Sequence, residues 1–555
     1  MRICVATSGD TLRTIAKKYN ADMKAVMDIN PHIQNSDANI EGMSVRIPDI
    51  PPACNSVREH IQFGPPVADE YAENWIPITP LEQMAQTDYD VLIIGSGAAG
   101  GGVLWRLSQR WGNNGKKIGM IEAGDLFLPT HLINIPTYNL GLVEAIWKNP
   151  RYSKRIRESY STNHLPPMPV DYFISNVLGG KTLHWGAACP RMFPFDLSRL
   201  HVSKQDMNNY YNVAERMMNV TQEFAKGSAF QEVMLQRLQI SAFPEAMDVP
   251  MAVDLTQTQL GRLHSNVFFS SIIPLAAALN IRPVDLTVQS RTLRVVTAHN
   301  RVTGVEVASP DQKMYTLNAK TVVLAAGSLE TPRILLHSGI QGEAIGRYLT
   351  NHSRLDAAGL ALRSEMPEDL GILNVLIPRT ASRLFQMQIH YLNYSEYREP
   401  PLKHEVPVIF IPSGLVEPRF DNCVTLDPYR TDEYGIPELR IHLSYSEEDY
   451  AVIRQMERAI REAASAMNVR LFEKNGQPAI TLRRPGGENH EMGTCRMGIN
   501  PVTSAANLYG QIHGMSGLYV AGNCVIPTTV AANPTLTAVA LAIRTADYIA
   551  EENNV

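Results

Sequence analysis

Closely spaced glycines after an apolar run, with an acid further along, are the first residues whose types and spacing could do chemistry. Val91–Ile94 is apolar and partly β-branched, as in a buried parallel strand, and Gly95-Ser96-Gly97-Ala98-Ala99-Gly100 follows it directly. Gly95 suits a tight turn, Gly97 lets the backbone approach a pyrophosphate, and Gly100 lets a helix pack on the strand. The N-terminus of that helix would stabilise phosphate charge.

Glu122 is the acid. It follows a second predicted strand, 117–121, and lies about 20 residues beyond the last glycine, where an acid accepts hydrogen bonds from ribose hydroxyls. Strand, loop, helix, strand and acid together favour dinucleotide binding over a glycine-rich turn of any α/β protein. They leave FAD and NAD both open.

A histidine, an asparagine and a helix start form a second pattern near the C-terminus. His490 lies within the stretch 489–498, and 518–523 is typical of a strand entering a turn. Ala532-Asn533-Pro534-Thr535 then opens an apolar helix, since proline suits a first helical turn. The pKa of an imidazole suits proton transfer near neutral pH, and an asparagine amide can hold an oxygen but cannot act as a base. A lone histidine is more often structural, so His490 gains weight only from these neighbours.

A third stretch, 176–186, combines two glycines, Gly179 and Gly180, with Thr182, His184 and Trp185. It resembles the flavin-contacting loop of the glucose–methanol–choline (GMC) oxidoreductases. The His-Trp pair looks most like the sugar-oxidising branch near pyranose 2-oxidase and glycoside 3-oxidase. The C-terminal pattern closely resembles that of the same family, and the resemblance spans about residues 88 to 555.

The resemblance implies a role for each motif. His490 would be the catalytic base, taking a hydroxyl proton while hydride passes to flavin N5, and Asn533 would be its partner. A helix N-terminus near the flavin would stabilise the anion formed on reduction. The implied FAD-binding residues are Gly95, Gly97, Ala98, Gly100, Glu122, Gly180, Thr182, His184, Leu293 (through its backbone, to adenine), Asn523 and Thr535.

Two positions depart from the family pattern. Leu183 replaces a small hydroxyl residue next to His184. Two roles therefore stay open for His184: a covalent bond to the flavin, as in pyranose oxidases, or packing and hydrogen bonding only. Gly522 stands where the family often has an aspartate, so the hydrogen bonds to the ribityl chain are expected to differ.

The first 48 residues follow a β-α-α-β pattern, with a helix whose N-cap is predicted at Asp10 and a second helix from about Asp22. SGDTLRTIAKKY, INP and EGMSVRIP resemble a LysM module, a class that binds N-acetylglucosamine-containing glycans. Glycan binding and a purely structural role in packing or self-assembly both remain open.

We therefore expect an α/β protein. A Rossmann-like FAD-binding domain would be built from two sequence halves, with an antiparallel-sheet substrate domain inserted between them. The expected boundaries are 1–49 for the LysM module, 50–86 for a proline-rich linker, 87–349 for the first FAD-binding part, 350–480 for the substrate domain and 481–555 for the last FAD-binding part.

Composition excludes several other classes. The net charge of −5 is spread without a long run, which argues against a nucleic-acid partner. Six cysteines without a CxxC pair argue against a zinc site or a disulfide framework, and no metal is expected. We find no run of about 18 apolar residues and no signal peptide, so we expect no membrane span and a cytoplasmic protein. Cell-wall association through LysM stays open.

The leading functional hypothesis is FAD-dependent oxidation of a secondary alcohol of a sugar or glycoside to a ketone. One alternative is oxidation of a primary alcohol on an aminosugar or polyol. Another is a LysM-based glycan-binding protein with an inactive flavin fold. The sequence does not choose between oxygen and a quinone as the electron acceptor.

Overall fold

The structure is a computed structural model that describes residues 2–19, 21–47, 76–134, 157–161, 171–255, 267–366, 371–391, 404–486 and 488–552. The chain divides into two compact units, Met1–Ala68 and Asp69–Val555. Most of the expected linker, residues 50 to 75, lies outside the described residues. Its last part folds as the short helix α4 (Leu81–Met84), in which Met84 is fully buried.

The N-terminal unit has the predicted β-α-α-β order. Strands β1 (Arg2–Val5) and β2 (Ser44–Ile47) pair antiparallel, and helices α1 (Leu12–Lys18) and α2 (Met23–Asp28) lie between them in the chain. The unit has its own apolar core, formed by side chains from both helices, from β2 and from the connecting segments.

The N-cap of α1 is Thr11, not Asp10 as the sequence suggested. The Thr11 side chain accepts a hydrogen bond from the backbone N–H of Thr14. The Asp10 carboxylate instead accepts hydrogen bonds from the backbone N–H and hydroxyl of Thr7, so it closes the turn before the helix. Either oxygen-bearing side chain could cap the helix, and Asp10 is used one turn earlier.

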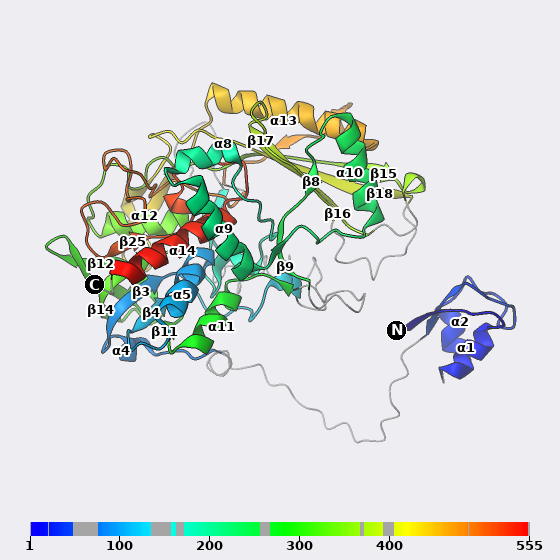
Figure 1. Ribbon diagram of the computed structural model, residues 1–555, viewed down its shortest axis with the longest axis horizontal. Coiled ribbons are helices and arrows are strands. Elements are labelled where there is room, and N and C mark those ends of the chain that lie inside the picture. The colour runs from blue at the N-terminus through cyan, green and yellow to red at the C-terminus, as the bar shows by residue number, and fades with distance from the viewer. Residues whose placement is uncertain are drawn as a thin grey trace, which may run out of the picture. The chain divides into compact units, whose positions relative to one another are not determined.

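One of the two large sheets of the larger unit has seven strands, and Figure 1 labels β3, β4, β11, β12, β14 and β25 of it. Its strand order is β11-β4-β3-β14-β13-β12, with β25 paired to the end of β14. The bounds are β3 Asp88–Ile94, β4 Ile118–Ile121, β11 Asp285–Thr287, β12 Arg291–Ala298, β13 Arg301–Ala308, β14 Met314–Leu324 and β25 Leu518–Val520. The pairs β11–β4, β4–β3, β3–β14 and β14–β25 are parallel. The pairs β14–β13 and β13–β12 are antiparallel. The sheet therefore joins segments from both ends of this unit.

Helix α5 (Ala98–Trp111) packs against α11 (Ile272–Ile281) and α14 (Thr535–Glu552). Glycines allow this close approach, because a Cβ on Gly101 would lie 2.2 Å from Oγ of Ser271. Nearly the whole of α14 is buried, which agrees with the apolar helix predicted after Asn533.

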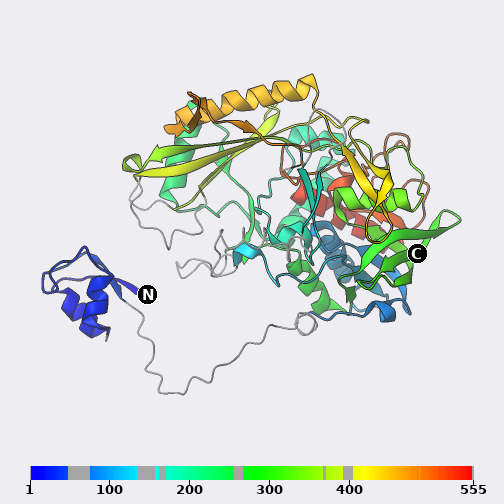
Figure 2. The same cartoon turned by 180° about the vertical axis from the view of Figure 1, so that it is seen from behind.

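A second sheet of seven strands is antiparallel throughout, in the order β21-β15-β18-β17-β16-β8, with β24 paired to β15. Its bounds are β8 Met247–Asp248, β15 Ser353–Leu362, β16 Leu373–Ile377, β17 Phe385–Tyr391, β18 Glu405–Gly414, β21 Val469–Leu471 and β24 Thr481–Leu482. Helix α13 (Glu447–Ala466) packs against β15 and β18 (Figure 2). Residues 385–391 alternate apolar and polar side chains, a pattern that predicts a half-buried strand, and they form β17. The apolar side chains of Phe385, Met387 and Ile389 join the core there, and the intervening polar residues point to the opposite face.

Smaller elements complete the described fold. Segment 200–280 holds helices α9 to α11 with short strands between them. The bounds are β5 Arg157–Ser161, β6 Asp171–Ser175, α8 Pro194–Leu197, α9 Lys204–Met218, β7 Val220–Thr221, α10 Ala229–Ser241, β9 Met251–Asp254, β10 Val267–Phe268, α12 Gly327–His337, β19 Cys423–Thr431, β20 Pro437–His442, β22 Glu473–Lys474 and β23 Gln477–Pro478.

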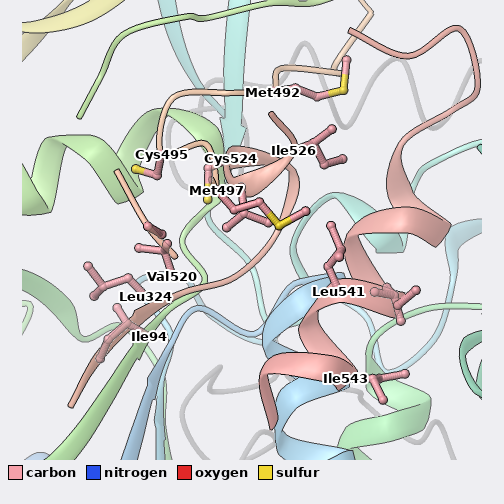
Figure 3. Packing of buried hydrophobic residues seen from close by; sticks show 14 of the residues in the cluster. Ile94, Leu324, Met492, Cys495, Met497, Val520, Cys524, Ile526, Leu541 and Ile543 are labelled. Atoms are coloured by element: carbon pink, nitrogen blue, oxygen red, sulfur yellow. The ribbon is translucent and has the colours of Figure 1, made fainter. Parts of the chain in front are cut away.

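One apolar core contains side chains from the first sheet's early strand β3 and from its last strand β25, which lie far apart in the sequence. Ile94, Leu324 and Val520 end three neighbouring strands and lie in one buried cluster with Met492 and Leu541 (Figure 3). The α/β fold class is confirmed. None of the helices within the described ranges has the length and apolar character needed to cross a membrane.

Candidate active site

A cavity of about 590 Å3 lies at the carboxyl ends of β3, β4 and β14. Its lining includes the residues that directly follow these strands, among them Gly95, Glu122 and Ala325. Residues of β15, β17 and β18, of the segment 174–188 and of the C-terminal stretch also line it. Ligands of open α/β sheets commonly bind at the carboxyl ends of the strands, and this volume is that of a site for a small molecule or cofactor.

Gly97 and Gly100 have different roles in the glycine loop. Gly97 precedes α5 with a φ of −65°, and a Cβ added to it would meet no atom within 4 Å. A Cβ on Gly100 would lie 1.9 Å from the carbonyl oxygen of Gly95. Gly97 therefore leaves space beside the cavity, whereas Gly100 allows the first turn of α5 to pack on the loop. Gly100 does not line the cavity.

Glu122 is buried directly after β4, and its carboxylate accepts hydrogen bonds from the glycine loop. One carboxylate oxygen accepts hydrogen bonds from the backbone N–H of Ser96 at 3.0 Å and from its hydroxyl at 2.6 Å. The other accepts from the N–H of Gly124 at 2.9 Å. Burial raises the pKa of this carboxyl, and the hydrogen bonds from Ser96 and Gly124 oppose that shift. A carboxylate has about four acceptor positions, so Glu122 retains capacity for a ligand hydroxyl.

The loop containing Gly180 and His184 packs directly on the glycine loop. A Cβ on Gly180 would lie 3.2 Å from Cα of Gly97. The Thr182 hydroxyl donates to the carbonyl of Gly179 at 2.6 Å and accepts from the N–H of Ser271 at 2.8 Å, which fixes the 3-10 turn Gly180–Leu183.

His184 lines the cavity and is held by a hydroxyl. Its Nε2 lies 2.7 Å from Oγ of Ser175, a hydrogen-bond distance. This nitrogen therefore has a protein partner in the structure.

His490 lines the cavity with a side chain that is 18% exposed. Its Nδ1 lies 3.1 Å from Nδ1 of His352 and 3.8 Å from Oε2 of Glu488. Burial lowers the pKa of His490 well below its usual value, and the neighbouring His352, Arg354 and Lys181 act in the same direction. The ring is therefore neutral near neutral pH, with a lone pair on one of its nitrogens.

Asn533 also lines the cavity and lies just before α14. Its side-chain oxygen accepts hydrogen bonds from Nε2 of Gln386 at 2.8 Å and from Nε2 of Gln388 at 2.6 Å. Because both glutamine amides occupy the oxygen, the amide nitrogen is the atom that Asn533 offers to a ligand. Asn533 can therefore hold an oxygen by donating a hydrogen bond, while His490 accepts a proton.

His352, Glu488 and His490 place ligand-type atoms within 4.8 Å of one another, the one such group of acids, histidines and cysteines in the described part of the chain. The sequence predicted no metal site. Here Nη1 of Arg354 lies 2.8 Å from Oε1 of Glu488, so a guanidinium already supplies positive charge to the acid. This arrangement favours an ion pair and a histidine pair over a metal ion.

Most residues singled out from the sequence meet at this cavity. Its lining includes His490, Asn533, Gly95, Gly97, Ala98, Glu122, Gly180, Thr182, His184, Asn523 and Thr535. Leu293 does not line it, although the adjoining residues Ser290, Arg291 and Thr292 do. The side chain of Leu293 is buried with Ala308 and Ile436.

The sequence missed several polar residues around His490 and Asn533, namely His352, Arg354, Gln386, Gln388, His390 and Glu488. No local motif marks them. The alternation of apolar and polar residues over 385–391 predicts a strand, but it does not show which face of the strand meets the cavity. That information would be needed to identify Gln388 and His390, which line the cavity.

Family models and individual relatives of this chain indicate the same protein family. The chain matches the models described as GMC oxidoreductase over residues 176–354 and 418–542, and the LysM domain over residues 4–48. It is 31% identical over 414 residues to a C-glycoside 3-oxidase of Arthrobacter globiformis, covering 69% of this chain and 76% of that protein. It is 26% identical over 426 residues to a pyranose 2-oxidase of Tricholoma matsutake, covering 68% and 73%. The crystal structure of a pyridoxine 4-oxidase from Mesorbium loti shares the fold, with a TM-score of 0.62, 15% identity and coverage of 83% of this chain and 99% of that one.

Proposed function

Because this chain belongs to the GMC oxidoreductases, FAD-dependent enzymes that act on CH–OH groups, we propose that it oxidises a secondary alcohol of a sugar or glycoside to a ketone. The observation that carries the proposal is that His490 and Asn533 both line this cavity. One side chain can accept the hydroxyl proton, and the other can hold the same oxygen through its amide nitrogen.

The cavity residues fit FAD. The space beside Gly97 admits a pyrophosphate next to the N-terminus of α5, and Glu122 retains acceptor capacity for ribose. Thr535 begins α14 at the cavity, so this helix N-terminus would stabilise anionic groups bound near it. Bound FAD would supply the acceptor for the hydride that leaves the alcohol carbon.

The chain's own groups manage the hydroxyl proton. His490 takes it as a general base, a contribution of about 10²–10⁴-fold in rate. Asn533 donates a hydrogen bond to the alcohol oxygen and keeps it in place as charge develops there. The lowered pKa of His490 keeps the ring unprotonated before the reaction.

A polyhydroxylated substrate is supported by the polar groups near His490. Gln388, His390, Arg354 and Ser413 all line the cavity and can exchange hydrogen bonds with hydroxyl groups. The names of the two relatives, C-glycoside 3-oxidase and pyranose 2-oxidase, favour ring carbon 2 or 3 as the reacting position.

The test is anaerobic reduction of the flavin absorbance by monosaccharides, glycosides and polyols, followed by admission of air. We expect a sugar or glycoside to bleach the wild-type flavin, and the product to carry a ketone. His490→Ala should retain the flavin and lose bleaching, whereas His404→Ala, at an exposed histidine, should bleach normally. Bleaching by primary alcohols alone would overturn the secondary-alcohol assignment, and a protein without flavin would support the binding-only alternative. Reoxidation by air would identify oxygen rather than a quinone as an acceptor.

A further inference from the structure

The ring of His352 lies between His490 and a backbone carbonyl. Its Nε2 is 2.5 Å from the carbonyl oxygen of Val530, and its Nδ1 is 3.1 Å from Nδ1 of His490. The side chain is 1% exposed, and the two imidazole rings meet edge to face at 72°. His352 does not line the cavity, so it acts on the reaction only through His490.

The carbonyl of Val530 determines where the proton of His352 lies. A carbonyl oxygen can only accept a hydrogen bond, so Nε2 of His352 must carry the hydrogen. Burial lowers the pKa of His352 to about 4, which leaves the ring neutral with a lone pair on Nδ1. The 3.1 Å contact between the two Nδ1 atoms then requires the hydrogen to be on His490.

We propose that His352, anchored by the carbonyl of Val530, is a positioning residue that holds His490 in the tautomer with hydrogen on Nδ1 and a bare Nε2. In the other tautomer, two lone pairs would face each other at 3.1 Å. The bare Nε2 is the atom that takes the substrate proton, and this last step rests on the proposed function of His490. After proton transfer, Nδ1–H of the charged ring still donates to His352.

The backbone explains why the two rings face each other. Thr350 and Met492 form an antiparallel bridge, with hydrogen bonds of 3.1 and 2.9 Å in both directions. His352 lies two residues after Thr350, and His490 lies two residues before Met492. The same antiparallel register therefore brings them opposite each other. The Thr350 hydroxyl also donates to the carbonyl of Val416, which ties the bridge to the segment that follows β18.

Other charged groups near Nδ1 of His490 do not replace His352. Oε2 of Glu488 lies 3.8 Å away, beyond hydrogen-bond distance, and this acid is paired with Arg354. Lys181 is paired with Glu491 at 3.1 Å. His352 is therefore the group positioned to accept from Nδ1.

The direct test is the ring ¹⁵N spectrum of the full-length protein, labelled at histidine, with His490→Gln and His352→Asn used for assignment. We expect Nδ1 of His490 to be of the protonated type and its Nε2 of the bare type, with the opposite pattern for His352. A bare Nδ1 on His490 would overturn the proposal. This readout does not depend on turnover, so it stays decisive even if His490→Ala proves active and the proposed function fails.

Kinetics give a second, independent test. His352→Leu removes the acceptor and should lower kcat by about 10²–10⁴-fold, up to the whole contribution of a general base, with KM and bound flavin unchanged. His352→Asn keeps an oxygen acceptor near the Nδ1 position and should recover part of that loss. An unchanged kcat in the leucine variant, or a loss that appears only in KM, would overturn the positioning role. If the leucine variant does not fold, the spectrum of the wild-type protein still decides.

Discussion

The side-chain oxygen of Asn533 lies 2.8 Å from Nε2 of Gln386, a residue of the second sheet. Gln386 is 1% exposed and does not line the cavity, so it contacts Asn533 from behind. The contact joins the strand β17 to the segment before α14. It sets which end of the Asn533 amide faces a ligand.

Replacement of Gln386 by glutamate should disturb this orientation. A carboxylate facing the Asn533 oxygen would favour rotation of the amide, so that its nitrogen turns away from the substrate. We expect kcat to fall by about 10²–10³-fold, the typical cost of losing one hydrogen-bond donor at a developing charge. Gln386→Leu should cost less, because Gln388 still donates to the same oxygen at 2.6 Å.

Steady-state kinetics with parallel measurement of flavin content would check this. Gln109→Glu, at an exposed position, is the matched control and should leave kcat unchanged. Equal effects of the leucine and glutamate changes would contradict an orientation effect.

The pH dependence of kcat/KM should show an acidic limb well below pH 6.5. His490 must be unprotonated to act as a base, and burial lowers its pKa well below the usual value. Activity should therefore be constant through neutral pH and decline only as the pH falls through that lowered pKa. Lys181→Met removes a nearby positive charge that lowers the pKa, so its limb should move to higher pH. A limb at or above 6.5 in the wild type would show that burial does not control this histidine.

Sequence patterns predicted the parts of the fold in which adjacent residues carry the signal. The apolar run ending at Ile94, the glycines after it and the acid at Glu122 form one βαβ unit of about 30 residues, so short-range rules apply. The start of α14 after Asn533 was likewise visible from local residues. The cap of α1 was misassigned because Asp10 and Thr11 both carry suitable oxygens, and only their contacts distinguish them.

The polar groups around His490 could not be predicted in this way. His352 lies 138 residues earlier in the chain and meets His490 through a bridge between two separate segments. Gln386 lies 147 residues before Asn533, on a strand of the other sheet. A strand's alternation identifies two faces, but it does not say which face meets a cavity that two sheets build together.

Gly97 and Gly100 offer a contrast between ligand binding and folding. Gly97→Ala places a methyl group where no atom lies within 4 Å, at a φ of −65° that alanine adopts readily. We expect normal thermal stability without flavin and much weaker FAD binding, because the methyl group occupies the space for the pyrophosphate. Gly100→Ala forces a Cβ to within 1.9 Å of the Gly95 carbonyl oxygen and should lower stability directly. Thermal unfolding of the flavin-free proteins and flavin titration would separate these effects, and equal stability loss in both variants would contradict the assignment.

The flavin should be released by acid. His184 Nε2 is held by the Ser175 hydroxyl at 2.7 Å, and Leu183 departs from the pattern of the covalent branch. We therefore expect acid precipitation of the purified protein to leave the yellow cofactor in the supernatant, and His184→Ala to weaken binding without changing this result. Flavin that remains with the pellet in the wild type and not in the variant would establish a covalent bond at His184.

The N-terminal LysM domain should bind glycan independently of turnover. Its core is formed within residues 6–47, by side chains such as Leu12, Ile15 and Val45, and it belongs to the separate unit Met1–Ala68. We expect a protein lacking residues 1–68 to keep its flavin and its kcat on small sugars. Sedimentation with insoluble chitin or peptidoglycan should be lost in the shortened protein and kept in the full chain, with cellulose as the matched polymer without N-acetyl groups. Equal sedimentation of both proteins would contradict a glycan-binding role and favour a structural one. Loss of kcat on truncation would instead show that the domain supports the catalytic unit.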